Sequence, residues 1–129
     1  MPNRIQLRRT RGWRKPPNCV AVARPTIFGN PFTVAAAREA GYGEWIDGRR
    51  AKPEETEPML RQWCVELFRD WLTTNRDRVR PELREKVLAR LPELRGKDLA
   101  CWCSPDSPCH GDVLIELANR QDATDASRT

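Results

Sequence analysis

The fold turns on the stretch Asp98-Leu99-Ala100-Cys101-Trp102-Cys103-Ser104-Pro105-Asp106-Ser107-Pro108-Cys109-His110. Residues 98–102 are largely apolar and predict a strand, and residues 112–119 carry apolar side chains at helical spacing and predict a helix. Between them, the two prolines of residues 104–108 indicate a turn. This strand-to-helix loop holds three of the chain's five cysteines and its only histidine. We therefore expect chemistry at this loop, either metal binding or a covalent reaction.

The spacing of the cysteines brings their sulfurs together. Side chains two positions apart on a strand point to the same face, so Cys101 and Cys103 share one face and Trp102 lies on the other. The turn then returns the chain and brings Cys109 and His110 to the same place. Three thiolates and an imidazole suit tetrahedral zinc, and the predicted metal ligands are Cys101, Cys103, Cys109 and His110. The spacing Cys-x-Cys-x5-Cys-His differs from those of common zinc fingers and ribbons.

Two other interpretations of the loop stay open. A cysteine beside the start of a helix is ionised by the helix dipole and by a neighbouring histidine, which predicts Cys103 as a nucleophile and His110 as its catalytic partner. Alternatively, the cysteines are reduced and unliganded and pack under Trp102, with His110 as an ordinary residue of the first helical turn.

The rest of the chain indicates a small α/β domain. Apolar and β-branched residues predict two earlier strands, at 5–7 and 19–23. Apolar residues at helical spacing predict three earlier helices, at 34–40, 56–72 and 81–91, with a surface loop over 41–55. The expected fold is α/β, with a small mixed sheet of about three strands and three to four helices. We expect one domain over residues 1–119 and a disordered C-terminal tail over 120–129.

The directions of the strands decide which residues meet the cysteine loop. The nine residues 10–18 are too few for a parallel crossover, so the first two strands are antiparallel if they are neighbours. That arrangement sends the arginines after the first strand away from the cysteines. If the strands at 19–23 and 98–102 are parallel, their following loops emerge at one edge of the sheet, where Arg24 and Asn30 face the cysteines.

Positive charge is concentrated in the N-terminal third of the chain. The net charge is +5, but residues 1–38 hold eight positive side chains and no acid, so the remaining residues carry −3. Arginine offers forked donors to phosphate oxygens and an indole stacks on a base, which predicts a nucleotide or nucleic-acid surface. The predicted ligand-binding residues are Arg8, Arg9, Arg11, Trp13, Arg14, Arg24 and Asn30. The alternatives are a solvated arginine-rich strand edge and, for Gly29-Asn30-Pro31, an ordinary turn.

Composition also predicts the cellular setting. The sequence has no run of about 18 apolar residues for a membrane span and no signal peptide, so we expect a cytoplasmic protein with reduced cysteines and no membrane partner. An odd number of cysteines also fits disulfide pairing poorly. Cys19 and Cys64 lie in apolar surroundings and are expected to be core residues.

Three blocks of the sequence resemble a known family. They are Arg-Ile-Gln-Leu-Arg-Arg-Thr-Arg-Gly-Trp-Arg at 4–14, Arg-Pro-Thr-Ile-Phe-Gly-Asn-Pro-Phe at 24–32, and Leu-Arg-Gly-Lys-Asp-Leu-Ala-Cys-Trp-Cys through Cys-His at 94–110. In this order the blocks are similar to those of small bacterial and bacteriophage proteins catalogued as domain of unknown function 4326. The resemblance spans residues 4–119 and implies no activity, so the function has to be argued from the residues.

Three functional hypotheses follow. The leading one is a small zinc-binding α/β domain that engages a phosphate-bearing ligand, either nucleotide or nucleic acid, through its basic N-terminal face. The second is a nucleotide- or nucleoside-processing enzyme that uses the cysteine–histidine site. The third is a phage-type accessory protein that binds a host protein through an apolar surface patch. The sequence leaves the ligand, catalysis and the oligomeric state open.

Overall fold

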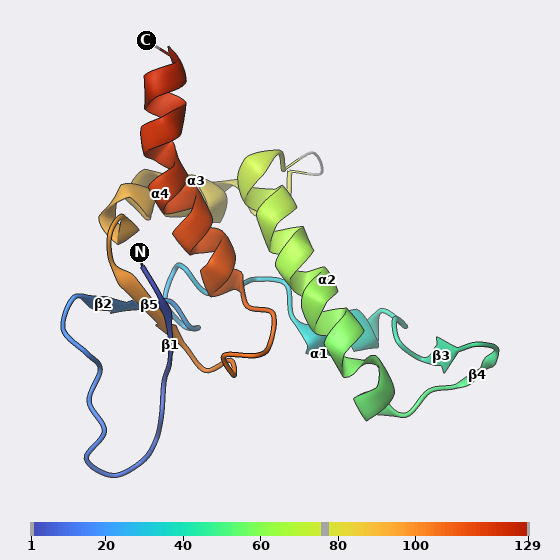
Figure 1. The fold of residues 1–129 in the computed structure, drawn as a ribbon. Coiled ribbons are helices and arrows are strands. Elements are labelled where there is room, and N and C mark those ends of the chain that lie inside the picture. The colour runs from blue at the N-terminus through green and yellow to red at the C-terminus, as the bar shows by residue number, and fades with distance from the viewer. Residues whose placement is uncertain (1, 76–77, 129) are drawn as a thin grey trace.

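Three short strands form the central sheet, in the spatial order β1 (Arg4–Gln6), β5 (Asp98–Cys101) and β2 (Cys19–Ala21). The computed structural model describes residues 2–75 and 78–128, with side chains described as far as Arg120. β5 pairs in parallel with both neighbours (Figure 1). Leu99 and Ala100 of β5 have no exposed surface, as expected of a parallel strand that is covered on both faces.

The first two strands of the chain are not neighbours, so the antiparallel pairing expected for adjacent strands does not occur. β5 lies between β1 and β2 and pairs with each of them in parallel. The short connection between β1 and β2 would force antiparallel pairing only if these two strands were neighbours. Because β5, from much later in the sequence, lies between them, that restriction does not apply. The α/β class is confirmed, and the strands at 19–23 and 98–102 are parallel as expected. The segments that follow all three strands therefore emerge at one edge of the sheet.

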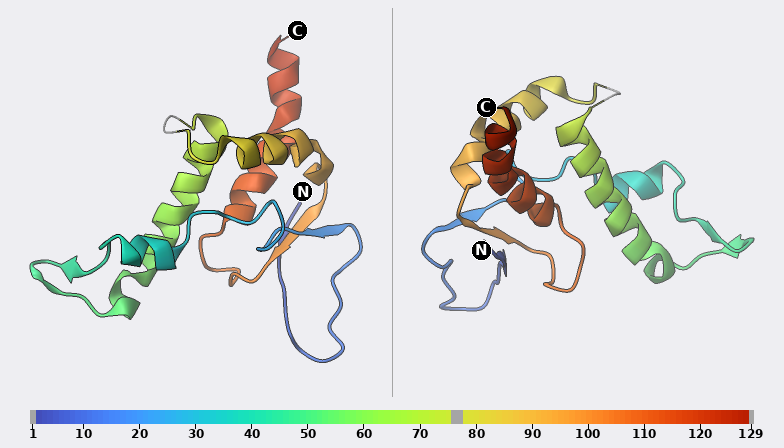
Figure 2. Two further views of the ribbon diagram at one scale, coloured as in Figure 1. Left: turned by 180° about the vertical axis from the view of Figure 1, so that it is seen from behind. Right: turned by 45° about the horizontal axis from the view of Figure 1, so that its top comes forward.

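All four predicted helices are present; α4 packs against β5, α2 lies beside α4, and α1 lies beside α2 (Figures 1 and 2). Their bounds are α1 (Val34–Glu39), α2 (Pro53–Thr73), α3 (Pro81–Arg90) and α4 (His110–Arg128), with a 3-10 turn at Leu91–Leu94. Thr33 caps α1, because its hydroxyl accepts a hydrogen bond from the Ala36 N–H over 3.0 Å. Pro53 and Pro81 each open a helix, at a position where the missing N–H costs nothing.

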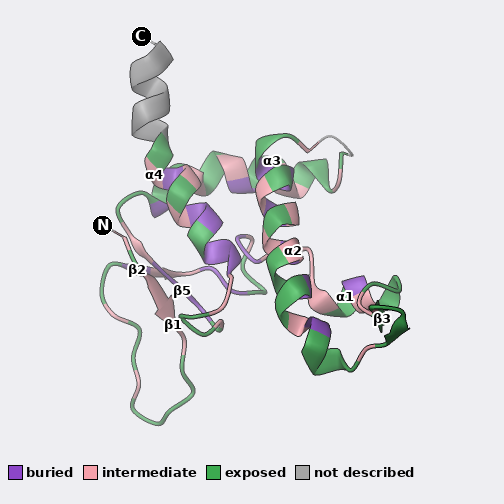
Figure 3. Cartoon of the chain, turned by 45° about the vertical axis from the view of Figure 1, so that its right-hand side comes forward, coloured by how far each residue is buried: buried purple, intermediate pink, exposed green. Residues whose placement is uncertain are grey.

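The core lies between the sheet, α2 and α4. Phe68 and Trp71 of α2 are in one buried cluster with Val113 and Leu114 of α4 and with Leu99 of β5. Figure 3 shows buried residues along β5 and at the start of α4, which is where the cysteine loop joins them. The remaining two cysteines are buried as predicted, Cys19 at the start of β2 and Cys64 within α2.

The predicted surface loop over 41–55 contains a small β-hairpin that the apolar pattern did not predict. β3 (Trp45–Ile46) pairs antiparallel with β4 (Arg49–Arg50), and the hairpin projects away from the rest of the molecule (Figure 1). Its turn is Asp47-Gly48, and both residues have positive φ. Asp-Gly is a strong signal for such a turn, but strands of two residues are too short to show a period.

Helix α4 continues past residue 119. The division into a domain over 1–119 and a tail over 120–129 stays a prediction, and Thr129 lies outside the described residues. In the part of the chain that the structure describes, no helix has both the length and the apolar character needed to cross a bilayer.

Candidate metal centre

The structure brings three sulfur atoms together at the carboxyl edge of the sheet. Cys101 ends β5, Cys103 follows two residues later, and Cys109 immediately precedes α4. Their sulfurs all lie within 4.8 Å of one another, and those of Cys101 and Cys109 are 3.0 Å apart. Cys101 and Cys109 are buried and Cys103 is half-buried, whereas Trp102 points away and keeps 45% of its surface exposed. Three cysteines are therefore close enough together to hold a metal ion.

The turn that closes this cluster is built by the loop itself. The Ser107 N–H donates to the Ser104 carbonyl over 3.0 Å, with Pro105 at the position of a β-turn that favours proline. Cys109 then begins the first helical turn: its carbonyl accepts from the Asp112 N–H over 3.1 Å, and its sulfur accepts from the Gly111 N–H over 3.4 Å. The sulfur of Cys109 thus occupies the positive end of α4.

The three thiols do not share charge equally. Hydrogen bonds from Cys101 and Cys103, together with the neighbouring His110, hold the pKa of Cys109 well below that of an ordinary thiol despite its burial. Hydrogen bonding to Cys103 and Cys109, and then burial, raise the pKa of Cys101. For Cys103 the hydrogen bond with Cys101 acts to lower the pKa, but the hydrogen bond with Cys109 and burial outweigh it and the pKa is raised. Of the three sulfurs, that of Cys109 is therefore the one whose ionised form the surroundings favour.

His110 is held beside the cluster rather than within it. Its Nε2 atom lies 2.8 Å from the Val22 carbonyl, which can only accept, so Nε2 carries a proton. Nδ1 then faces the sulfur of Cys109 at 3.7 Å, and the edge of the ring packs against Phe68. The group of mutually close ligand atoms contains Cys101, Cys103 and Cys109 but not His110. The histidine anchors the start of α4 to the end of β2.

The donor set fits zinc. Zn–S bonds of about 2.3 Å in a tetrahedral site place sulfurs about 3.8 Å apart. The sulfur–sulfur separations here run from 3.0 Å to at most 4.8 Å, so small side-chain rotations bring all three to that spacing. Thiolates select zinc over the hard cations magnesium and calcium. The three sulfurs fill three of four positions.

A cavity of about 270 Å³ adjoins the cluster. Its lining includes Cys103 and His110 from the cysteine loop and Arg24 and Asn30 from the loop after β2, as the parallel arrangement of the strands predicted. Arg24 is exposed. Both polar atoms of the Asn30 side chain are used within the fold, because Nδ2 donates to the Cys64 carbonyl and Oδ1 accepts from the Phe32 N–H. Of this pair, Arg24 is the side chain whose polar end remains for a ligand.

The arginines after β1 emerge at the edge of the sheet that carries the cysteine loop. The guanidinium of Arg9 lies over the ring of Trp102, 4.5 Å from its centre. The other predicted ligand-binding residues of this connection are Arg8, Arg11, Trp13 and Arg14. They lie between β1 and β2, and among the described residues of that connection none lines the cavity. The basic surface and the cavity are therefore adjacent, and they share Trp102, which carries Arg9 and also lines the cavity.

A family model described as "Domain of unknown function (DUF4326)" matches residues 5–120, which include all three strands of the main sheet except Arg4 and the whole cysteine loop. The chain belongs to the DUF4326 family. It is also similar to the "Uncharacterized 12.4 kDa protein in nrdA-td intergenic region" of Enterobacteria phage T4, with 31% identity over 94 residues that cover 72% of this chain and 73% of that protein. No solved structure matches the chain. The resemblance drawn from the sequence is confirmed.

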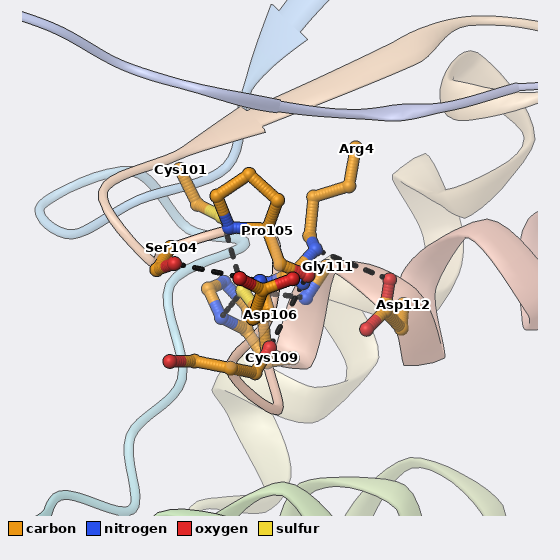
Figure 4. Close-up of polar contacts among 10 residues, drawn as sticks. Arg4, Cys101, Ser104, Pro105, Asp106, Cys109, Gly111 and Asp112 are labelled. Atoms are coloured by element: carbon orange, nitrogen blue, oxygen red, sulfur yellow. Dashed lines mark hydrogen bonds and ion pairs between the residues drawn. The ribbon is translucent and has the colours of Figure 1, made fainter.

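Two arginines of this DUF4326 domain belong to the site, although sequence reasoning did not select them. Arg61 of α2 lines the cavity and pairs with Glu57 over 2.9 Å. Arg4 of β1 lies against the cysteine loop (Figure 4). Arg61 falls on the polar side of a strongly periodic helix, and Arg4 counts in the sequence as one of many N-terminal positive charges. Neither position carries a local signal, because the structure alone brings these residues to the cysteines.

Proposed function

We propose that this DUF4326 domain binds zinc through Cys101, Cys103 and Cys109 and holds a small phosphate-bearing ligand, such as a nucleotide, in the adjoining cavity. The observation that carries the proposal is the meeting of three mutually close sulfurs with a cavity that two arginines line.

A metal site explains the cluster better than a free catalytic thiol. The thiolate, Cys109, is only 2% exposed and is poorly placed to attack a substrate. Cys103 does line the cavity, but its raised pKa keeps it protonated at neutral pH. A bound zinc ion removes this conflict, because it favours the ionised form of all three sulfurs at once.

The same geometry supports an enzyme as the second candidate function. Three protein ligands leave the fourth tetrahedral position for water or substrate, an arrangement typical of catalytic rather than structural zinc. Zinc bound there would supply a Lewis acid and a water of lowered pKa. All three cysteines line the cavity and Cys103 is the most exposed of them, so that position would face a molecule in the cavity.

Cavity size and charge favour a small anion over a polymer inside the site. A volume of about 270 Å³ is close to the lower end of the usual range for small-molecule sites, about 300–1,000 Å³. Arg24 and Arg61 provide positive charge at the cavity, and ligands of parallel α/β sheets bind at this edge. Nucleic acid would instead contact the neighbouring basic surface around Arg9 and Trp102.

Host-protein binding stays a separate proposal. Large apolar side chains are exposed on and near the projecting hairpin and at the start of α2, namely Tyr42, Trp45 and Met59. These three lie on segments other than the cysteine loop, whereas Trp102, which is also exposed, belongs to that loop.

Metal analysis of protein purified without added zinc tests the proposal. We expect about one zinc per chain in the wild type, loss of most zinc in Cys103→Ser, and retention in Cys64→Ala, which removes a buried cysteine outside the cluster. Circular dichroism establishes that each variant is folded. A wild-type protein that takes up no zinc while three thiols react freely would contradict the proposal.

A further inference from the structure

Arg4 is a buried arginine tied to the cysteine loop. Its side chain is 10% exposed. Nη2 donates to two carbonyls of the loop, Pro105 over 2.7 Å and Ser107 over 2.8 Å, and Nε pairs with Asp112 of α4 over 3.3 Å. Figure 4 shows the side chain reaching from β1 across the loop to the start of α4. One residue therefore connects the strand, the turn and the helix that position the three cysteines.

One donor of this guanidinium is left over. Nη1 is buried, and no hydrogen-bond partner for it is found among the described residues. Buried donors without partners are rare because they lose their hydrogen bonds to water and gain none within the protein. The contacts with the loop and with Asp112 therefore use Nη2 and Nε of Arg4 but leave Nη1 unexplained.

The neighbouring group of suitable charge is the sulfur of Cys109. Burial alone would lower the pKa of Arg4, but its interaction with Cys109 and the charge of Asp112 outweigh it and the pKa is raised. Gly111 lies between them: a Cβ built there would be 3.5 Å from Arg4 Cδ and 3.6 Å from Cys109 Sγ. The Arg4 side chain and the Cys109 sulfur thus both border Gly111 in the first turn of α4.

The charge of a zinc site at these cysteines would account for the position of Arg4. One zinc ion and three thiolates carry a net charge of −1, and a buried net charge is strongly unfavourable unless it is compensated. The fixed positive charge of Arg4 offsets it, and a donor to a ligating sulfur fixes that ligand's orientation from the second coordination sphere. Asp112 is too exposed to cancel the charge of Arg4, since 55% of its side-chain surface is accessible.

We propose that Arg4 is a positioning residue of the metal centre, which neutralises the zinc–trithiolate and holds Cys109 against the other two sulfurs. The inference rests on the proposed zinc site and deepens it. It predicts that this site has a higher affinity for zinc than three cysteines in a flexible loop would have.

The test compares Arg4→Met and Arg4→Lys with Arg8→Met, which removes an exposed arginine of the same segment. Zinc affinity is measured by competition with a chromophoric chelator. We expect Arg4→Met to weaken zinc binding about 10-fold or more, as loss of second-sphere partners typically does. Arg4→Lys, which keeps the charge but not the fork, should fall between Arg4→Met and the wild type, and Arg8→Met should match the wild type.

Cobalt substitution separates an effect on the sulfur from a loss of folding. A thiolate-to-cobalt charge-transfer band should shift in Arg4→Met and be partly restored in Arg4→Lys, whereas a purely structural role would leave its position unchanged. If Arg4→Met does not fold, the zinc affinity and band position of Arg4→Lys alone test the role of Arg4, because lysine keeps a buried cation at the site. Equal zinc affinity and an unshifted band in the folded variant would overturn the role of Arg4. A wild-type chain that binds neither metal would overturn the metal site as well.

Discussion

Cys103 and Cys109 divide between them the two properties that a reactive thiol needs. Both line the cavity, but Cys109, which has the lowered pKa, is almost fully buried, and Cys103, which is half-buried, has a raised pKa. Charge and access coincide only if a metal ion ionises the whole group. The pKa and burial of these two cysteines therefore favour zinc binding over a thiol nucleophile.

His110 is the residue for which the sequence and the structure suggest the most different roles. Sequence proximity to Cys109 predicts His110 as the fourth ligand. In the structure Nε2 contacts the Val22 carbonyl and the ring packs against Phe68, while Nδ1 stays 3.7 Å from the Cys109 sulfur, so the ligand role of His110 stays a prediction. Spacing along the chain reveals which residues are neighbours. It does not reveal that the Val22 carbonyl fixes the imidazole through Nε2 and turns Nδ1 toward the Cys109 sulfur.

Replacement of His110 by alanine distinguishes these roles. We expect His110→Ala to lower the free energy of unfolding by about 2–4 kcal/mol, because it leaves the Val22 carbonyl unpaired and opens a cavity beside Phe68. Zinc content at saturating metal should stay close to that of the wild type. Urea denaturation and metal analysis provide the two readouts. Unchanged stability together with lost zinc would return His110 to the set of ligands.

At the scale of elements, the site depends on three parallel strands that end side by side. The apolar patterns predict each strand to within a residue or two, but they do not predict the strand order. A central strand that arrives late in the chain separates two strands that appear adjacent in sequence. This order places Arg9 over Trp102 and Arg4 against the cysteine loop, so that the basic segment and the cysteines meet.

The loop after β2 is shaped by a close approach at Gly29. A Cβ at Gly29 would lie 2.5 Å from Arg24 Cγ and 3.0 Å from the Arg24 backbone. The sequence Gly29-Asn30-Pro31 is thus more than an ordinary turn: the glycine leaves room for the arginine of the cavity, and the asparagine fixes the loop to α2.

Gly29→Ala should therefore displace Arg24. We expect a loss of stability of about 1–3 kcal/mol from overpacking. The proposed phosphate-bearing ligand should also bind more weakly, whereas zinc content should be unchanged because the sulfurs lie on another loop. Isothermal titration with nucleoside monophosphates and metal analysis measure the two effects. Normal ligand binding in a folded Gly29→Ala protein would remove Arg24 from the site.

Across the whole molecule, positive charge is weighted toward the N-terminal third, which carries +8, whereas the remainder carries −3. Nucleic-acid binding through the basic surface depends on release of counterions, whereas a small ligand in the cavity contacts few charges. Salt concentration therefore separates the two classes of ligand.

A salt titration provides that comparison. If about six phosphates of an oligonucleotide contact the basic surface, affinity should fall by about 1,000-fold between 50 and 200 mM salt. Binding of a mononucleotide in the cavity should weaken much less. Single-stranded and duplex oligonucleotides and a mononucleotide are titrated in parallel by fluorescence anisotropy. Equal and shallow salt dependence for all of them would argue against a nucleic-acid role for the arginines.

The central claim is that the three sulfurs bind one zinc ion and leave one position open. X-ray absorption at the zinc edge of the purified protein tests it most directly. We predict three sulfur neighbours at about 2.3 Å and one lighter atom at about 2.0–2.2 Å, with the sulfur signal reduced in Cys103→Ser. Zinc surrounded only by nitrogen and oxygen, with all three thiols still free, would contradict the account.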